Sequence, residues 1–185
     1  MTRHCHRRSM AARRGTRTRR AVAAPAAALI VLAGLTSCTP EVKGVTGLTV
    51  DAHGRPHAAL AWCADRPPDL VVLTSVAESA SPGAPTPERP YWPRRKYDVP
   101  RDAAAPALVP LEGFPPGPVA DGQAAFRVSG ATHDNSFRTE GVDFRIAELA
   151  ELRPGSVLVT DFDDSGEVLR TVPLDEFTEM GEKAC

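Results

Sequence analysis

The segment Asp161-Phe162-Asp163-Asp164-Ser165-Gly166 contains the residue types of a calcium-binding loop, with oxygen ligands at its first, third and fifth positions and glycine at its sixth. A loop of that kind needs a bidentate glutamate at its twelfth position, which is Val172 here. The segment also lies between two stretches with strand character. We therefore predict a turn shaped by its aspartates and glycine rather than a metal site.

A second polar loop holds His133, Asp134 and Ser136, which are the residue types of a hydrolytic triad. Neighbours in one loop seldom reach the geometry of nucleophile, base and orienting acid, and the chain has no Gly-x-Ser-x-Gly turn. Asp134 and Asn135 are better explained as turn residues that bond their own backbone. We predict no catalytic residue and no cofactor. An envelope hydrolase that uses His133 or the carboxylates of 161–164 is the alternative.

The segment 91–97 combines three aromatic and three cationic side chains in an otherwise acidic mature chain. Trp, Tyr and Arg are frequent anchors of binding surfaces, so the segment predicts contact with an anionic wall polymer, a glycan or a protein. The predicted contact residues are Tyr91, Trp92, Arg94, Arg95 and Tyr97. The alternative is that the aromatic rings pack this loop onto the domain while the cations face water.

The first 37 residues have the organisation of an export signal. Eight arginines and no acid occur in the first twenty residues, and an apolar stretch over 21–34 follows them. That stretch is shorter than the roughly 20 residues of a spanning helix. It leads into Leu35-Thr36-Ser37-Cys38, which matches the bacterial lipobox. The pattern predicts removal of 1–37, a diacylglycerol on Cys38, and a position on the extracytoplasmic face of the cell membrane.

Other interpretations of this region stay open. Cleavage near Ser37 without lipidation would give an ordinary secreted protein with an incidental thiol at Cys38. Arg19-Arg20 leaves twin-arginine export beside the general secretory route, and Met10 is a possible start in place of Met1.

The predicted mature chain is acidic. Residues 38–185 contain 14 Lys and Arg against 23 Asp and Glu, a net charge of −9. This balance argues against nucleic acid as a partner and against attraction to an anionic membrane surface.

Cysteine usage also indicates an exported protein. Cys5 leaves with the signal and Cys38 carries lipid, so Cys63 and Cys185 remain. Two cysteines in an oxidising compartment most simply form one disulfide. No second Cys or His lies at metal-ligand spacing from either, which disfavours a metal site.

The chain beyond a short tether, 38–44, has the pattern of an all-β domain over 45–185. We expect the first three strands, over 47–51, 57–64 and 70–76, to form one meander. Further strands are expected over 124–130, 142–146, 156–162 and 167–172, together with two short helices near the C-terminus. Ala58, Leu60 and Trp62 alternate with Ala59, Ala61 and Cys63, so this strand should be covered on both faces. The proline-rich loop 79–122 allows one edge strand near 107–111. Seven or eight short strands predict an immunoglobulin-like β-sandwich, with a small, partly open barrel as the alternative.

A series of short motifs runs through the predicted mature chain. They are Val50-Asp51, Gly54-Arg55-Pro56, Cys63, Asp134-Asn135-Ser136-Phe137, Val142-Asp143-Phe144, Glu148-Leu149, Leu152-Arg153-Pro154-Gly155, and a closing phenylalanine and cysteine. These motifs resemble those of a group of small exported actinobacterial proteins without assigned function. The resemblance covers most of the mature chain outside the proline-rich loop. It implies a shared fold and an extracytoplasmic location, and it brings no catalytic motif.

Together these observations predict a membrane-anchored binding module. Its contact surface is expected on the 91–97 loop and an adjoining polar loop over 131–141. A purely structural accessory lipoprotein is the remaining alternative.

Overall fold

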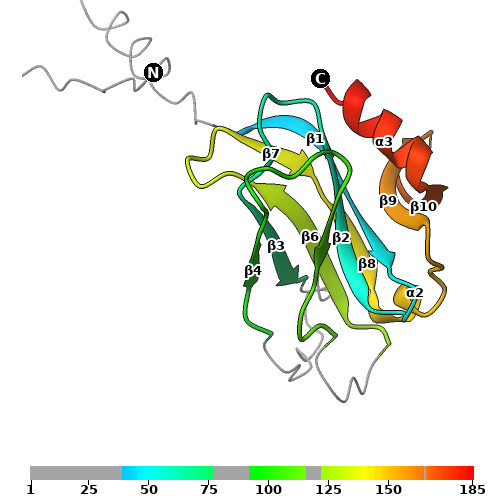
Figure 1. Cartoon of the computed structure of the whole chain (residues 1–185). Coiled ribbons are helices and arrows are strands. Elements are labelled where there is room, and N and C mark those ends of the chain that lie inside the picture. Colours follow the sequence, from blue (N-terminus) through cyan, green and yellow to red (C-terminus); the bar gives the residue numbers. More distant parts are fainter. Residues whose placement is uncertain (1–38, 77–91, 116–121, 165) are drawn as a thin grey trace, which may run out of the picture. The chain divides into compact units, whose positions relative to one another are not determined.

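A computed structural model describes residues 39–76, 92–115, 122–164 and 166–185 (Figure 1). These ranges contain ten strands and two short helices, which confirms the all-β prediction. The strands are β1 (Glu41–Val50), β2 (Pro56–Trp62), β3 (Leu70–Ser75), β4 (Arg95–Asp98), β5 (Ala107–Pro110), β6 (Ala125–Ala131), β7 (Phe137–Glu140), β8 (Val142–Arg145), β9 (Ser156–Asp163) and β10 (Gly166–Pro173). The helices are α2 (Ile146–Leu149) and α3 (Leu174–Lys183).

The first hairpin forms as predicted. β1 and β2 pair antiparallel from Val50↔Pro56 to Gly44↔Trp62. Asp51 closes their turn, because its Oδ1 accepts the backbone N–H groups of His53 and Arg55, and Gly54 supplies the positive φ of +74°. These bonds, that from Arg55 first, lower the pKa of Asp51 to about 2.

The third strand does not continue a meander. β2 is already paired with β1 on one side and with β5 on the other, so no edge of β2 is left for β3. The chain crosses the domain through residues 63–69, and β3 pairs instead with β6 and β4. The predicted edge strand near 107–111 is β5, whereas β4 lies within the region expected to be loop.

The loop expected over 131–141 contains a strand, β7. The inward residues of β7, Phe137 and Thr139, have odd numbers, whereas those of β8, Val142 and Phe144, have even numbers. The alternation of inward and outward residues is therefore interrupted between the two strands, which hides β7 in the sequence. The register against β6 shifts by one residue between them, from Ala131↔Arg138 to Val128↔Val142. Gly141 lies at this β-bulge, where a side chain would meet the Val128 carbonyl.

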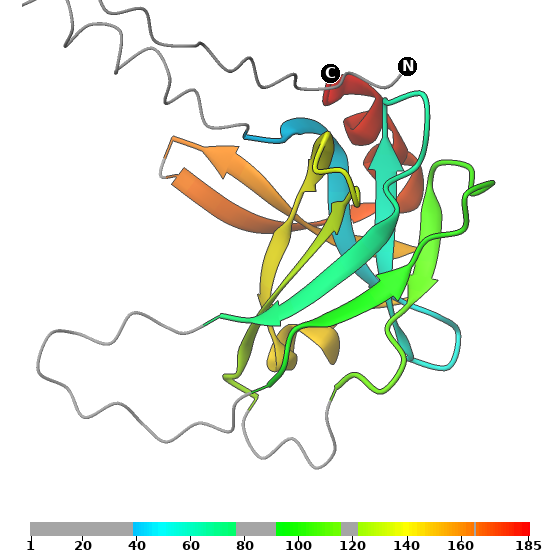
Figure 2. The same cartoon turned by 90° about the vertical axis from the view of Figure 1, so that its left-hand side faces the viewer.

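The ten strands form one continuous mixed sheet that curves around the core, with a parallel pair between β1 and β7 (Figures 1 and 2). This arrangement lies nearer to the partly open barrel than to two separate sheets. The edges at β4 and β5 meet through side chains. Arg95 Nη1 and Tyr97 Oη both donate to the carbonyl of Glu112, just beyond β5, at 3.2 and 3.3 Å.

Two apolar clusters lie on the two faces of β2. Ala58, Leu60 and Trp62 belong to the larger cluster inside the curved sheet, so Trp62 is a core residue as predicted. Ala59 and Ala61 face outward into a smaller cluster that α3 covers with Phe177. β2 is therefore buried on both faces, as its uniformly apolar sequence predicts.

Residues 39–185 form one compact unit of the chain. β1 begins at Glu41, so only Thr39 and Pro40 of the expected tether precede the first strand, while Cys38 lies outside the described residues. β1 starts early because Glu41 and Val42 pair in parallel with Phe137 and Arg138 of β7. No helix in the described ranges has the length and apolarity needed to cross a membrane.

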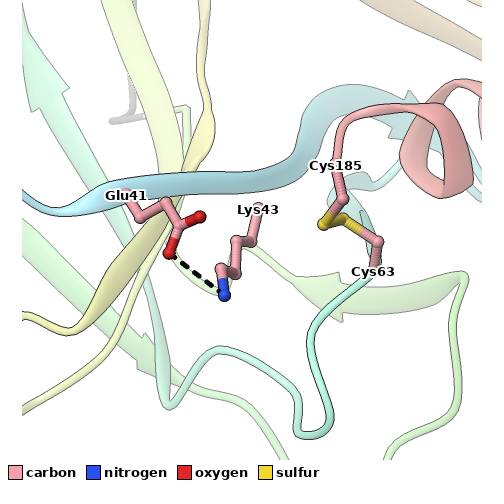
Figure 3. The surroundings of a disulfide bond; sticks show 4 residues. All are labelled: Glu41, Lys43, Cys63 and Cys185. Carbon is pink, nitrogen blue, oxygen red and sulfur yellow. Dashed lines mark ion pairs between the residues drawn. A yellow bond between two sulfur atoms is a disulfide. The ribbon is translucent and has the colours of Figure 1, made fainter.

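Cys63 and Cys185 form the predicted disulfide (Figure 3). It fastens the end of α3 to the residue that follows β2, across a sequence separation of 122. Gly181 of α3 lies against Ala61 so closely that a Cβ there would be 2.3 Å from the Ala61 Cβ. The disulfide and this close approach therefore hold α3 on the outer face of β2.

Candidate binding surface

Three of the five predicted contact residues serve packing. Trp92 and Tyr97 lie against the larger core cluster, and the Arg95 guanidinium stacks over the Trp92 ring at 4.7 Å. Burial raises the pKa of the Tyr97 hydroxyl. Gly113 leaves the space that Arg95 fills, since a Cβ there would be 2.7 Å from Arg95 Nη1. Arg95 and Tyr97 join β4 to the carbonyl of Glu112 beyond β5, and Trp92 packs against Arg95 and the core. Tyr91 lies outside the described residues.

The remaining cations of the segment point outward. Lys96 alternates with Arg95 and Tyr97 along β4, so it lies on the outer face of the sheet and is exposed. Arg94, directly before β4, is exposed as well. β4 thus separates the segment into an inner side that packs and an outer side that presents positive charge.

The ladder registers place further cations on this outer face. In β6 the inward residues are Phe126 and Val128, which leaves Arg127 outward, paired with Asp143 of β8. Arg138 of β7 and Arg145 of β8 also point outward, opposite Ala131 and Ala125. We call this surface the basic face. It comprises Arg94, Lys96, Arg127, Arg138 and Arg145, with three carboxylates among them, Asp98, Glu140 and Asp143.

The cations of the basic face differ in how they are engaged. Arg127 makes a bidentate pair with Asp143 at 2.5 and 2.7 Å, and this hydrogen bonding raises the pKa of Arg127. Arg145 Nη1 donates to the Gln123 side chain at 3.3 Å. Arg94, Lys96 and Arg138 have no ion pair with any residue that the structure describes. Three charges on this face are thus available to an external anion.

The acidic residues concentrate elsewhere on the domain. Residues 156–185, which form β9, β10 and α3, carry eight carboxylates and two cations. These elements lie on the other side of the domain from β3 and β4 in Figure 1. The net charge of −9 therefore conceals an uneven distribution: five cations gather on the basic face and carboxylates dominate residues 156–185, although Glu167 of β10 lies near enough to Arg127 to help raise the pKa of that guanidinium.

The polar loop between β6 and β7 is held by a local network. Arg66 Nη1 bonds Asp69, and its Nη2 bonds Asp134 Oδ2 at 2.9 Å and Ser136 Oγ at 3.3 Å. The backbone N–H of His133 donates to Asp69 Oδ2 at 2.8 Å and is the main cause of the lowered pKa of Asp69. Hydrogen bonds from Ser136 lower the pKa of Asp134 in the same way.

This network is a turn, as its residue types predict. Asp134 Oδ1 accepts the backbone N–H of Ser136, and Asn135 adopts a positive φ of 55°. The Asp134 carboxylate forms an ion pair with Arg66 and not with the His133 ring. His133, Asp134 and Ser136 therefore do not have the arrangement of base, orienting acid and nucleophile that a catalytic triad needs.

The segment 91–97 begins at the end of β3 far from the polar loop and runs along the strand toward it, with Tyr97 opposite Val71. Trp92 is beside Ser75, whose hydroxyl donates to the Trp92 carbonyl, whereas the loop at 132–136 lies next to Asp69, before the first residue of β3. A strand of six residues spans about 16 Å. The start of the segment at Trp92 is therefore separated from the turn at 132–136, whereas its end at Tyr97 approaches the end of β3 where that turn lies.

The Asp161–Gly166 segment forms the tip of the β9–β10 hairpin, with Glu167 paired to Phe162. Asp161 Oδ2 accepts from Arg170 Nε at 2.8 Å, and Arg170 also bonds Glu176 of α3 at 2.6 Å. Among the described residues, no group of three or more His, Cys, Asp or Glu side chains is placed to hold a metal ion.

Two depressions on the described part of the domain contain neither of the proposed hydrolytic groups. A depression of about 390 Å³ is lined by Arg66, Pro67, Pro68, Asp69, Val99 and Arg101. A second, of about 250 Å³, lies along residues 55–57 and 110–114. Neither His133 nor the 161–164 carboxylates line these cavities.

Comparisons with known protein families, with curated proteins and with solved structures find no match to this chain. Any functional assignment therefore depends on the surface chemistry of the molecule itself.

The sequence pattern pointed to Arg94 in the basic face but not to Lys96, Arg127, Arg138 or Arg145 as members of it. These residues lie on four different strands, and each has an ordinary alternating neighbourhood. These cations come close together because β3 pairs with both β4 and β6. The expected meander instead paired the third strand with the second.

Proposed function

We propose that this protein is an extracytoplasmic lipoprotein, anchored to the cell membrane by a diacylglycerol on Cys38, whose domain acts as a binding module for an anionic component of the envelope. The lipobox at 35–38 supports the anchor. The disulfide at Cys63–Cys185 suits an oxidising compartment outside the cytoplasm.

One observation carries the binding role, namely that the strand registers bring five cations together on the basic face while residues 156–185 carry eight carboxylates against two cations. A protein that needed charge only for solubility would be served by mixed surfaces. Concentrated cations without partners attract anions, and the attraction weakens with salt because exposed charges are screened. Arg94, Lys96 and Arg138 are therefore the contact residues of the proposed module.

The proposal differs from one based on the whole 91–97 segment. The structure between β4 and β5 depends on Trp92, Arg95 and Tyr97. Replacing any of them could lower binding simply by disturbing the fold. Arg94 and Lys96 can be reversed in charge without removing a described hydrogen bond.

The test measures how much soluble ectodomain sediments with washed bacterial envelope fragments at 50 mM salt. The ectodomain should begin at Thr39, because a start at Val42 would remove part of β1. We expect Arg94→Glu/Lys96→Glu to lower the bound fraction at least fivefold, since each cation near an anionic surface contributes ~1 kcal/mol.

The matched control is Arg153→Glu/Lys183→Glu, which changes net charge equally at exposed sites outside the basic face. Its binding should stay near that of the parent, and both variants should melt within a few degrees of it. Equal binding by the two double variants would overturn the proposal.

A further inference from the structure

We infer that the anionic component is the headgroup layer of the membrane that carries the anchor, so that the basic face rests on anionic lipid. This inference depends on the proposed lipidation of Cys38. The net charge of the chain argued against an anionic membrane as partner, whereas the uneven distribution of charge makes one side of the domain attractive to it.

The position of the anchor brings the basic face to the membrane. Cys38 is three residues from Glu41, and three extended residues span at most about 10 Å. Val42, the next residue, pairs with Arg138 of β7. The chain therefore leaves the lipid beside a cation of the basic face, and β1 cannot move that end of the face far from the headgroups.

The layout of the cations suits an extended charged layer. They are distributed over β4, β6, β7 and β8, where neighbouring strands are about 4.8 Å apart. None of Lys96, Arg127 and Arg138 lines either of the two depressions. The sheet curves around the core, so this outer face is convex (Figure 2). A convex face with dispersed charges fits a lipid surface better than it fits a small bound ligand.

The carboxylates of residues 156–185 do not cancel this attraction. A domain of this size is about 35 Å across, whereas exposed charges are screened within about 8 to 10 Å at physiological ionic strength. β9, β10 and α3 lie on the other side of the domain from β4 (Figure 1), which keeps the part of the basic face at Arg94 and Lys96 apart from their carboxylates, whereas Glu167 of β10 lies near Arg127.

The experiment uses the ectodomain from Thr39 without lipid, which contains both apolar clusters and the disulfide. Binding is measured by sedimentation with vesicles of phosphatidylcholine alone and with vesicles containing 30% phosphatidylglycerol. We expect binding only to the anionic vesicles, with a decrease of at least tenfold between 50 and 300 mM salt. Lys96→Glu/Arg138→Glu should weaken it at least 20-fold, since each charge near such a surface is worth about fivefold.

Arg153→Glu/Lys183→Glu is again the control and should bind nearly as the parent does. Equal binding to both kinds of vesicle, or equal loss in both variants, would overturn the inference. If the ectodomain ignores anionic vesicles but still sediments with lipid-depleted envelope fragments through Arg94 and Lys96, the inference fails and the proposed binding function stands. Loss of both interactions would remove both proposals.

Discussion

Replacing Cys63 and Cys185 by serine should lower the free energy of unfolding by about 4 kcal/mol. The disulfide closes a loop across 122 residues, and the chain-entropy model gives roughly 4 to 5 kcal/mol for a loop of that length. The bond also fastens α3 to the end of β2. Urea unfolding of the oxidised protein and of the double variant, monitored by tryptophan fluorescence, measures the difference.

The single variant Cys63→Ser is the control for this prediction. Because either substitution breaks the same bond, the single and double variants should have similar stability, and reduction of the parent protein should reproduce it. A loss below about 1 kcal/mol in the double variant would show that α3 is held by packing alone.

Replacing Phe177 by alanine should cost about 3 to 5 kcal/mol of stability, which is typical for removal of a fully buried phenylalanine. Phe177 is 0% exposed and is the aromatic side chain of the cluster between α3 and the outer face of β2. Its buried neighbours there are Ala59, Ala61, Val157, Val159 and Val172, and Val45, Leu174 and Met180 pack against the same cluster.

Phe162→Ala is the matched control, because this phenylalanine is 66% exposed near the tip of the β9–β10 hairpin. Its removal should change the free energy of unfolding by no more than about 0.5 kcal/mol. Similar losses in both variants would contradict the packing of α3 described here. Urea unfolding with the disulfide intact gives both values.

Local patterns predicted the parts of the fold that depend on neighbouring residues. Gly54 and Asp51 indicated the first hairpin, and the uniformly apolar residues of β2 indicated a strand covered on both faces. Phe177 and Met180 indicated the C-terminal helix. Each of these features follows from residues a few positions apart.

Features that depend on long-range pairing were not accessible in this way. β2 pairs with β5 rather than β3 because of a segment almost fifty residues further along the chain. The bulge at Gly141 inverts the alternation between Phe137 and Phe144, so a strand resembled a polar loop. The continuous curved sheet follows from these pairings, which local periodicity does not report.

The candidate surface shows the same division. The contrast of aromatic and cationic residues over 91–97 indicated an unusual segment, but the alternation of β4 assigns Arg95 and Tyr97 to packing and Lys96 to the exposed side. Arg127, Arg138 and Arg145 joined the surface only through the registers of β6, β7 and β8.

The anchor at Cys38 underlies both proposals, and the intact mass of the protein extracted from membranes tests it most directly. We expect a chain of residues 38–185 that carries the mass of a diacylglycerol on Cys38 and lacks two hydrogens for the bond between Cys63 and Cys185. A chain that begins at another residue, or one that begins at Cys38 without lipid mass, would contradict it.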